Sequence, residues 1–473
     1  MADPGERRAE LEEALDLAAS EARAFLAQID SDPVQPPGSE DAVTALGGGL
    51  PEEGDGAVAA AAELARLGRN SATRSAGPRF FHFVIGGATP AALAADWLTS
   101  SFDQNAGAWP ASPLASQLEA ICLDWLRDLF ALPVGFGGVL VTGGTMANFA
   151  CLAAAREWCG ERRGERVAAN GLANRSQIPV FSSGYIHASA LKSLAMLGIG
   201  SGSVRKLARD PAGRLDLEAL ERELGELGGE PAIVVANAGE VNTGDFDPID
   251  EMADLAEHHG AWLHVDGAFG LFARLSPRSA PLAAGAERAH SVSSDGHKWL
   301  NVPHDAGFAF VRERDDLAAT FAEEAAYLPR ADDPRPNWGF LGPEGSRRAR
   351  AFAIWATLRA YGRSGYRQMV ERHLDLAQHL AGRVDAEPEL ERLAEVPLNI
   401  VCFRWRPARA AEDELDELNR RLGDALLADG RVFAGTTLFE GKVAFRPAIV
   451  NWRTGEQDVG ALVDILLELS REI

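Results

Sequence analysis

The stretch GGVLVTGGTMANF, Gly137 to Phe149, shows the pattern that decides the fold of this 473-residue chain. Apolar residues up to Val141 predict a short buried strand, two glycines allow a tight turn, and the residues after them predict a helix. The same change from strand to helix recurs at IPVFSSG, PAIVVANAG and AWLHVDGA, and AGFAFVR adds another strand. Alternating strands and helices predict an α/β domain with a mostly parallel sheet.

Weaker patterns flank this region. Residues 6–28 and 57–67 predict amphipathic helices joined by an acidic, Pro- and Gly-rich connector. A long helix is predicted from Ser346 to Tyr361, and helices and strands after it predict a smaller α+β unit. We therefore predict an N-terminal helical segment, a large domain and a small C-terminal domain at residues 1–78, 79–362 and 363–473.

The composition, 46% hydrophobic and 24% charged, is ordinary for a globular protein. A formal net charge of −23 disfavours nucleic acid and anionic membranes as partners. No long apolar run predicts a membrane span, and the first residues do not resemble a secretory signal. None of the four cysteines has the spacing of a zinc site. We expect a cytoplasmic protein without a bound metal.

One lysine, Lys298, lies in a mostly apolar stretch of the sequence. The stretch SSDGHKWLNVPHDAGF, Ser293 to Phe308, places Lys298 among mostly apolar residues. A buried lysine tends to lose its proton and become a nucleophile, because desolvation of an ammonium is costly. Considered alone, the stretch favours a lysine whose stem lies on apolar surface and whose charge reaches water.

Three other motifs end predicted strands, where ligands bind in open α/β sheets. Gly144 and Thr145 begin a predicted helix and could bind an anion. His187, in SSGYIHASALKS, could stack on a flat ligand, and Asp266, in AWLHVDGAFG, could hold a protonated ring nitrogen. Singly, each has a structural explanation: a tight turn, a packing histidine or a helix cap. With Lys298, they provide what pyridoxal phosphate (PLP) needs.

These motifs resemble those of the pyridoxal-dependent group II decarboxylases, a family that includes aromatic-amino-acid, histidine and glutamate decarboxylases. GHKWL is similar to the family's HKW motif and HVDGA to its HVDAA motif, and the resemblance runs from about Pro78 to the C-terminus. It implies a fold type I enzyme with a seven-stranded, mostly parallel sheet that decarboxylates an L-amino acid to the amine and CO2. It also implies a homodimer in which the N-terminal helices wrap around the partner.

The resemblance also implies roles for individual residues. Lys298 would form the Schiff base with PLP, Asp266 would pair with the ring nitrogen, and His187 would be the third catalytic residue. The implied cofactor-binding set is Gly144, Thr145, His187, Asp266, Ala268, His297 and Lys298. Arg446 would bind the substrate carboxylate. The segments that form the family's substrate pocket contain Phe80, Phe81 and Trp109, which favours an aromatic or bulky apolar substrate side chain.

The sequence departs from the family pattern in three places. The loop LPRADDPRPNWGF, residues 328–340, lacks the family's proton-donating tyrosine and places Trp338 there, so Tyr327 or His187 would have to act instead. Val241 stands where a threonine is common. Asp295 stands where a phosphate-binding asparagine often occurs, and we expect Ser293 or Ser294 to take over that contact.

These departures leave two alternatives open. The same cofactor could serve transamination, carbon–carbon cleavage or oxidative deamination to an aldehyde. The chain could also be a catalytically silent homologue that works as a binding protein, although Lys298, Asp266 and His187 are all present.

Overall fold

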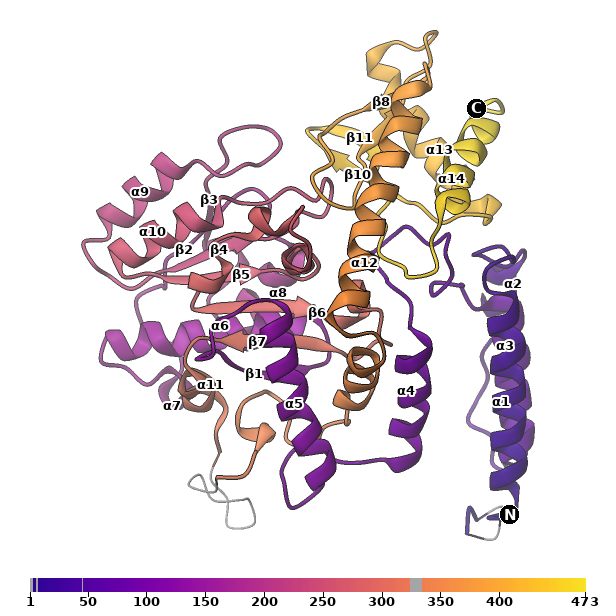
Figure 1. The fold of residues 1–473 in the computed structure, drawn as a ribbon, viewed down its shortest axis with the longest axis horizontal. Helices are drawn as coiled ribbons and strands as arrows, with labels where there is room; N and C mark the ends of the chain where they lie inside the picture. Colours follow the sequence, from indigo (N-terminus) through magenta and orange to yellow (C-terminus); the bar gives the residue numbers. More distant parts are fainter. Residues whose placement is uncertain (1–2, 6, 45, 324–333) are drawn as a thin grey trace.

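The large domain is built on one seven-stranded sheet (Figure 1). The computed structural model describes residues 3–5, 7–44, 46–323 and 334–473. The strand order is β1-β7-β6-β5-β4-β2-β3, and β7 alone runs against the other strands. The predicted seven-stranded, mostly parallel sheet is therefore confirmed. The strands are β1 Gly137–Val141, β2 Val180–Ser182, β3 Val204–Lys206, β4 Ile233–Asn237, β5 Trp262–Asp266, β6 Ser291–Asp295 and β7 Gly307–Val311.

The sequence patterns missed two of these strands, β3 and β6. Strand β6 reads SVSSD, yet all of its residues are buried. Its serines are tolerated because their hydroxyl groups form hydrogen bonds inside the domain, as those of Ser291 and Ser293 do. A hydrophobicity pattern therefore could not predict β6, the strand that leads directly to Lys298.

Helices cover the sheet and occupy the connections between its strands. Helix α6 packs against β1, β5, β6 and β7, and α10 packs against β4 and β5. On β5, the side chains of Trp262, His264 and Asp266 alternate onto one face, where Trp158 of α6 contacts the Trp262 ring. The helices are α5 Pro113–Leu129, α6 Gly144–Arg162, α7 Val167–Asn170, α8 Ala188–Met196, α9 Leu217–Glu226, α10 Ile249–His259 and α11 Arg314–Phe321.

A smaller unit with its own apolar core follows the long helix α12, Ala351–Ala386. The predicted helix at residues 346–361 therefore begins later and extends much further, with a kink at Gly362, where φ is 59°. The kink lies at the predicted domain boundary. The unit has an antiparallel sheet in the order β10-β11-β9-β8 and two helices. Its elements are β8 Leu390–Arg392, β9 Phe403–Trp405, α13 Leu415–Asp429, β10 Thr436–Phe439, β11 Lys442–Phe445 and α14 Glu456–Ser470.

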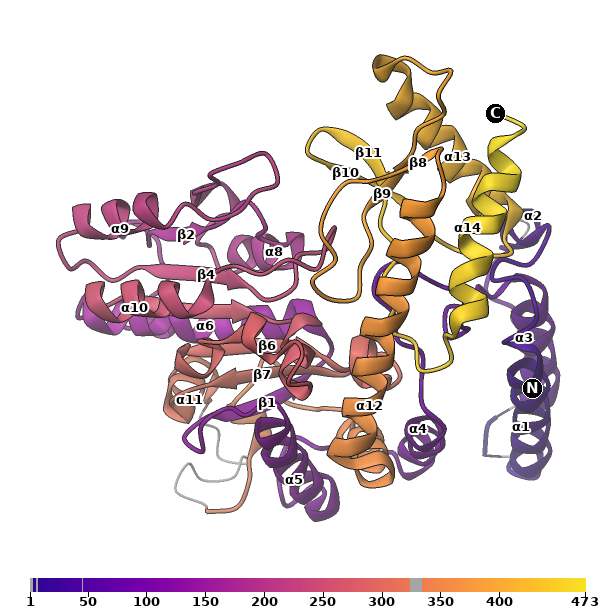
Figure 2. The ribbon, with the colours of Figure 1, turned by 45° about the horizontal axis from the view of Figure 1, so that its top comes forward.

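The N-terminal helices α1, Glu10–Gln28, and α3, Ala57–Ser71, lie side by side in both views (Figures 1 and 2). The short helix α2, Ser39–Thr44, lies near their end, and α4, Pro90–Phe102, packs on α12. Neither α1 nor α3 has a buried residue. In the described part of the chain, no helix is long and apolar enough to cross a membrane.

Candidate functional site

Neighbouring strand ends bring the predicted catalytic residues to one edge of the sheet. Asn237, Asp266 and Ser293 lie opposite one another in the registers of β4, β5 and β6. Lys298 follows β6 on a single π-helical turn, Gly296–Leu300. Parallel strands end at the same edge, so Asp266 and Lys298 face a common space there.

Lys298 is half-buried, and no fixed counter-ion holds its amine in the described part of the chain. Burial lowers the pKa of its amine, Asp295 and Asp266 oppose that shift, and the positive charge of Arg446 adds to it. Its Nζ lies 5.5 Å from the centre of the Phe269 ring, and it forms no ion pair with any residue in the described ranges. A lysine with a lowered pKa and no ion pair to any described residue is suited to attack an aldehyde.

Asp266 is buried and held by donors. Its Oδ2 accepts a hydrogen bond of 2.8 Å from Asn148 Nδ2, and its Oδ1 accepts one of 3.2 Å from the backbone of Ala268. Asn148 Oδ1 lies 2.9 Å from His264 Nε2, and burial lowers the pKa of His264 to about 4. The imidazole behind Asp266 is therefore neutral at pH 7, and the groups that contact the carboxylate here are neutral hydrogen-bond donors.

His187 lies at the start of α8, where it caps the helix. Its Nδ1 accepts a hydrogen bond of 3.2 Å from the Ser189 backbone and lies 2.7 Å from the Ser189 hydroxyl. The residue is exposed. Protein atoms nearby still lower its pKa by desolvation, opposed by Asp266 and reinforced by Lys298 and Arg446. His187 therefore lies within electrostatic range of Asp266 and Lys298.

The expected phosphate cradle contains a carboxylate of the chain itself. At the start of α6, the backbone of Gly144 donates a 2.5 Å hydrogen bond to Asp295 Oδ2. His297 Nδ1 lies 2.6 Å from Asp295 Oδ1, and His304 stacks on His297 with 4.6 Å between ring centres. Thr145 is half-buried beside them. The positive end of the helix dipole thus offsets part of the negative charge of Asp295.

The expectation that Ser293 or Ser294 would take over the phosphate contact is wrong. Both side chains are buried. Ser293 Oγ donates a 2.6 Å hydrogen bond to Asn148 Oδ1, and Ser294 Oγ donates a 3.5 Å bond to the carbonyl of Ala268. Their hydroxyl groups therefore stabilise the interior of the domain.

Arg446 lies at the site, on the side of the small domain. It is half-buried, and its Nη1 donates a 3.2 Å hydrogen bond to the carbonyl of Val241. The pKa of His82 is lowered to about 4, first by burial and then by Arg446. His82 was missed in the sequence, and its Nδ1 accepts a 3.2 Å hydrogen bond from the Gly435 backbone.

The predicted pocket residues lie in different surroundings. Phe81 is buried in the core of the small domain, and Phe80 stacks on Phe433 at 4.8 Å. The backbone of Trp109 donates a 3.1 Å hydrogen bond to the carbonyl of Pro336. These contacts give Phe81 a packing role, which counts against its predicted place in the substrate pocket.

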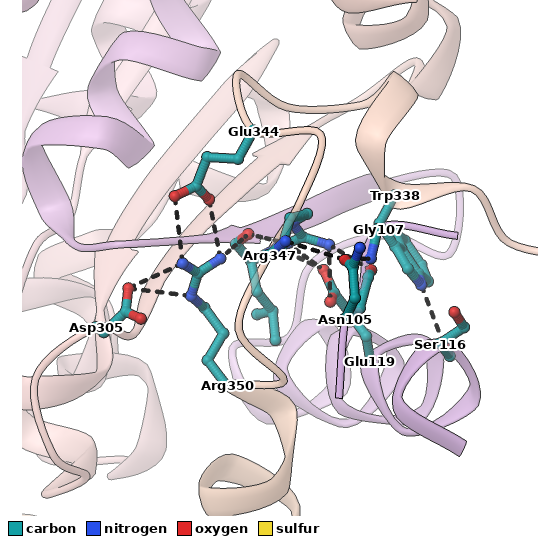
Figure 3. A network of polar contacts seen from close by, with 11 residues as sticks. Asn105, Gly107, Ser116, Glu119, Asp305, Trp338, Glu344, Arg347 and Arg350 are labelled. Carbon is teal, nitrogen blue, oxygen red and sulfur yellow. Dashed lines mark hydrogen bonds and ion pairs between the residues drawn. The ribbon is translucent and has the colours of Figure 1, made fainter. Parts of the chain in front are cut away.

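Trp338 is a packing residue, which corrects its predicted place in a mobile loop (Figure 3). Its side chain is buried, and its indole donates a 3.1 Å hydrogen bond to the carbonyl of Ser116 on α5. Nearby, Arg347 pairs with Glu119, and Arg350 lies between Asp305 and Glu344 (Figure 3). These ion pairs pin the chain after Trp338 to the large domain. Tyr327 lies outside the described residues.

Asn148 and His264 were also missed, although local signals for both exist. Asn148 follows Thr145 by three residues in a predicted helix, so both lie on nearby parts of its surface. His264 precedes Asp266 by two residues on a strand and therefore shares its face. Such spacing could have identified them as supporting groups.

The fold and this edge of the sheet define a PLP-dependent enzyme of fold type I. An amine that forms no ion pair with any described residue suits the aldehyde of that cofactor, an anchored carboxylate suits its ring nitrogen, and a glycine-led helix start suits its phosphate. At Gly144, a Cβ atom would lie 3.0 Å from Asp295 Oδ2, so a larger residue there would require this carboxylate to shift.

Comparison with known proteins identifies the family. The pyridoxal-dependent decarboxylase conserved domain matches residues 51–406. The L-2,4-diaminobutyrate decarboxylase of Rhizobium meliloti (strain 1021) is 33% identical over 434 residues, which cover 90% of this chain and 84% of that protein. The aromatic-L-amino-acid decarboxylase of Bacillus atrophaeus is 30% identical over 411 residues, covering 85% of this chain and 83% of that protein.

The fold is also similar to that of a solved structure. The crystal structure of Oryza sativa TDC with PLP and tryptamine matches with a TM-score of 0.89 and 25% identity, covering 98% of each chain. The chain belongs to the pyridoxal-dependent decarboxylase family, and it is a PLP-dependent amino-acid decarboxylase.

Proposed function

We propose that this enzyme decarboxylates an L-amino acid with an aromatic or other bulky side chain, releasing the amine and CO2, and that Lys298 is the covalent anchor of PLP. The observation that carries the proposal is the Lys298 amine itself. Its pKa is lowered by burial, it has no ion pair among the described residues, and it faces the same space as Asp266.

PLP, when bound, supplies an electron sink for the negative charge left at Cα as CO2 departs. In this proposal Asp266 would pair with the ring nitrogen, and His187 and Ala268 would lie against the ring. Gly144, Thr145 and His297 would hold the phosphate. Arg446 binds the substrate carboxylate and sets the direction of the bond that breaks. Selection of that bond accelerates decarboxylation over competing reactions.

An aromatic cluster beside Arg446 supports a bulky substrate side chain. Phe83 is 58% exposed, its ring centre is 4.0 Å from that of His82, and it lies 6.5 Å from that of Phe80. Exposed aromatic surface near a polar anchor is typical of small-molecule sites. The named relatives include enzymes for aromatic amino acids and for 2,4-diaminobutyrate, so the substrate has to be measured.

We further propose a homodimer in the cytoplasm. Exposed leucines on the paired helices α1 and α3 support an intersubunit contact: Leu11, Leu15 and Leu64 are 65%, 57% and 72% exposed. Exposed apolar surface of this kind marks protein interfaces. All four cysteines are free and buried, which is consistent with a reducing compartment. Light scattering after size exclusion would test the dimer.

The test is an absorption spectrum of the purified protein, followed by product analysis. A visible cofactor band that is lost on borohydride reduction, with the added mass on Lys298, would support the anchor. The enzyme would then be given tryptophan, tyrosine, phenylalanine, glutamate and 2,4-diaminobutyrate in turn.

CO2 and amine from an aromatic substrate are the expected result. An aldehyde product would favour oxidative deamination; one relative, 28% identical over 409 residues, is the phenylacetaldehyde synthase of Arabidopsis thaliana. No cofactor band, even after added PLP, would favour the silent homologue.

A further inference from the structure

We propose that Asn148 is a positioning residue that controls two groups of the site at once: its amide keeps Asp266 ionised and holds His187 neutral with the proton on Nε2. This inference rests on the roles proposed above for Asp266 and His187. It concerns a buried side chain of α6, which would itself contact neither the cofactor nor the substrate.

The Asn148 amide uses all of its hydrogen-bonding capacity. Its side chain is fully buried, and its Nδ2 donates to Asp266 Oδ2 at 2.8 Å and to Ser189 Oγ at 3.1 Å. Its Oδ1 lies 2.9 Å from His264 Nε2 and accepts from Ser293 Oγ at 2.6 Å. The opposite orientation would place Oδ1 against the carboxylate, so the contacts determine which atom is nitrogen.

A second chain of bonds fixes the orientation from the other end. The Trp262 indole can only donate, and it donates to Ser291 Oγ at 2.9 Å. That leaves the Ser291 hydroxyl hydrogen for His264 Nδ1, also at 2.9 Å, so His264 carries its proton on Nε2 and donates it to Asn148. Each donor from Trp262 onward therefore points toward Asp266.

The branch through Ser189 reaches His187. Because Ser189 Oγ accepts from Asn148, its own hydrogen is free to donate to His187 Nδ1 at 2.7 Å. The Ser189 backbone N–H donates to the same nitrogen at 3.2 Å. With Nδ1 accepting both bonds, the proton of a neutral His187 lies on Nε2, and the same amide sets the state of both groups.

A neutral amide suits this position for an electrostatic reason. Donated hydrogen bonds stabilise the ionised form of a carboxylate, but a second cation would compete with the ring nitrogen for it. A carboxylate at position 148 would do the reverse: two adjacent acids would share one proton, and Asp266 would lose part of its charge.

The decisive experiment compares Asn148→Asp with Asn148→Ala in holoenzyme loaded with PLP that is ¹⁵N-labelled in the ring. We expect Asn148→Asp to shift the ring-nitrogen signal toward the unprotonated value and to lower kcat by on the order of 10- to 100-fold with a smaller change in KM. Asn148→Ala should have weaker effects on both, because it removes a donor without adding an acid. A packing role predicts the reverse order, since alanine leaves the larger cavity.

Two further variants make the result interpretable. Asn419→Asp is the matched control, because Asn419 is equally buried and its amide makes three hydrogen bonds in the small domain, on α13. It should leave the ring-nitrogen signal unchanged. Asp266→Asn is the reference: if it leaves the signal unchanged, the proposed role of Asp266 is wrong. If Asp266→Asn shifts the signal and Asn148→Asp does not, only the role of Asn148 is overturned.

Discussion

Two buried polar networks of the large domain differ in the charge of their members. Around Asn148, neutral side chains form a chain of hydrogen bonds in which every donor points toward one carboxylate, that of Asp266. Around Arg347, full charges meet: its side chain is 1% exposed, and its partner Glu119 is 0% exposed. Ion pairs anchor chain segments, whereas neutral donors leave a charge available. In the described part of the chain, Asp266 is thus held by neutral donors, whereas Glu119 is held by a cation.

The largest effect should come from Lys298→Ala. The variant lacks the nucleophilic amine, so we expect turnover to fall by at least about 10³-fold, as when other covalent nucleophiles are removed. The fold should persist, because the amine has no ion pair to lose in the described structure. Turnover and borohydride-fixed cofactor would be measured together. Cofactor fixed as in the wild type would refute the anchor.

Asp266→Ala should follow, with turnover lower by about 10²- to 10³-fold, because one preorganised charge at the reacting group is removed. Folding should change much less than turnover. Steady-state kinetics and thermal unfolding of the same preparation would separate the two effects. Unchanged turnover would rule out the ring-nitrogen role.

Arg347→Met tests the charged network. It leaves the buried Glu119 unpaired, which should cost about 3–5 kcal/mol in the free energy of unfolding. Arg348→Met is a matched control, because the ion pair between Arg348 and Asp96 is partly exposed. This pair should contribute about 0–1 kcal/mol to the free energy of unfolding. Urea denaturation of both variants would measure the difference. Similar losses in the free energy of unfolding from the two variants would mean that burial does not determine how much an ion pair contributes to stability.

The neutral network should respond to pH. The pKa of His264 is lowered to about 4 by burial, against about 6.5 in an unfolded chain. Between these values the unfolded state binds more protons, so stability falls as pH falls from 6.5 toward 4, by up to about 3 kcal/mol. His264→Gln should flatten this slope in denaturation curves.

Asp247 contributes a slope of opposite sign, because burial raises its pKa to about 6. The His264→Gln variant must therefore be compared with the wild type at each pH. An unchanged slope in the variant would mean that the pKa of His264 is the same in the folded and the unfolded state.

Trp338→Phe should have the smallest effect. It removes one hydrogen bond to the carbonyl of Ser116 and keeps an aromatic ring, so we expect a loss of about 1 kcal/mol in stability and no change in turnover per bound cofactor. A large loss of turnover at equal cofactor content would restore the predicted loop role of this residue.

Local patterns in the sequence were sufficient for the α/β architecture and for the motif residues. Apolar strands β1, β4, β5 and β7 stand out because burial on both faces demands continuous apolar residues. Lys298 and Asp266 stand out for the opposite reason, since an ionisable group next to such strands is costly without a function.

Other features were decided by tertiary structure alone. Strand β6 is polar because its serines find partners on β5 and α6, far away in the sequence. Phe81 packs in the small domain and Trp338 packs on α5, although both occur in segments that resemble site motifs. The direction of the bonds through Asn148 depends on donors from four separate elements. A sequence reveals which groups can donate and accept, but only the packed structure decides which of them meet.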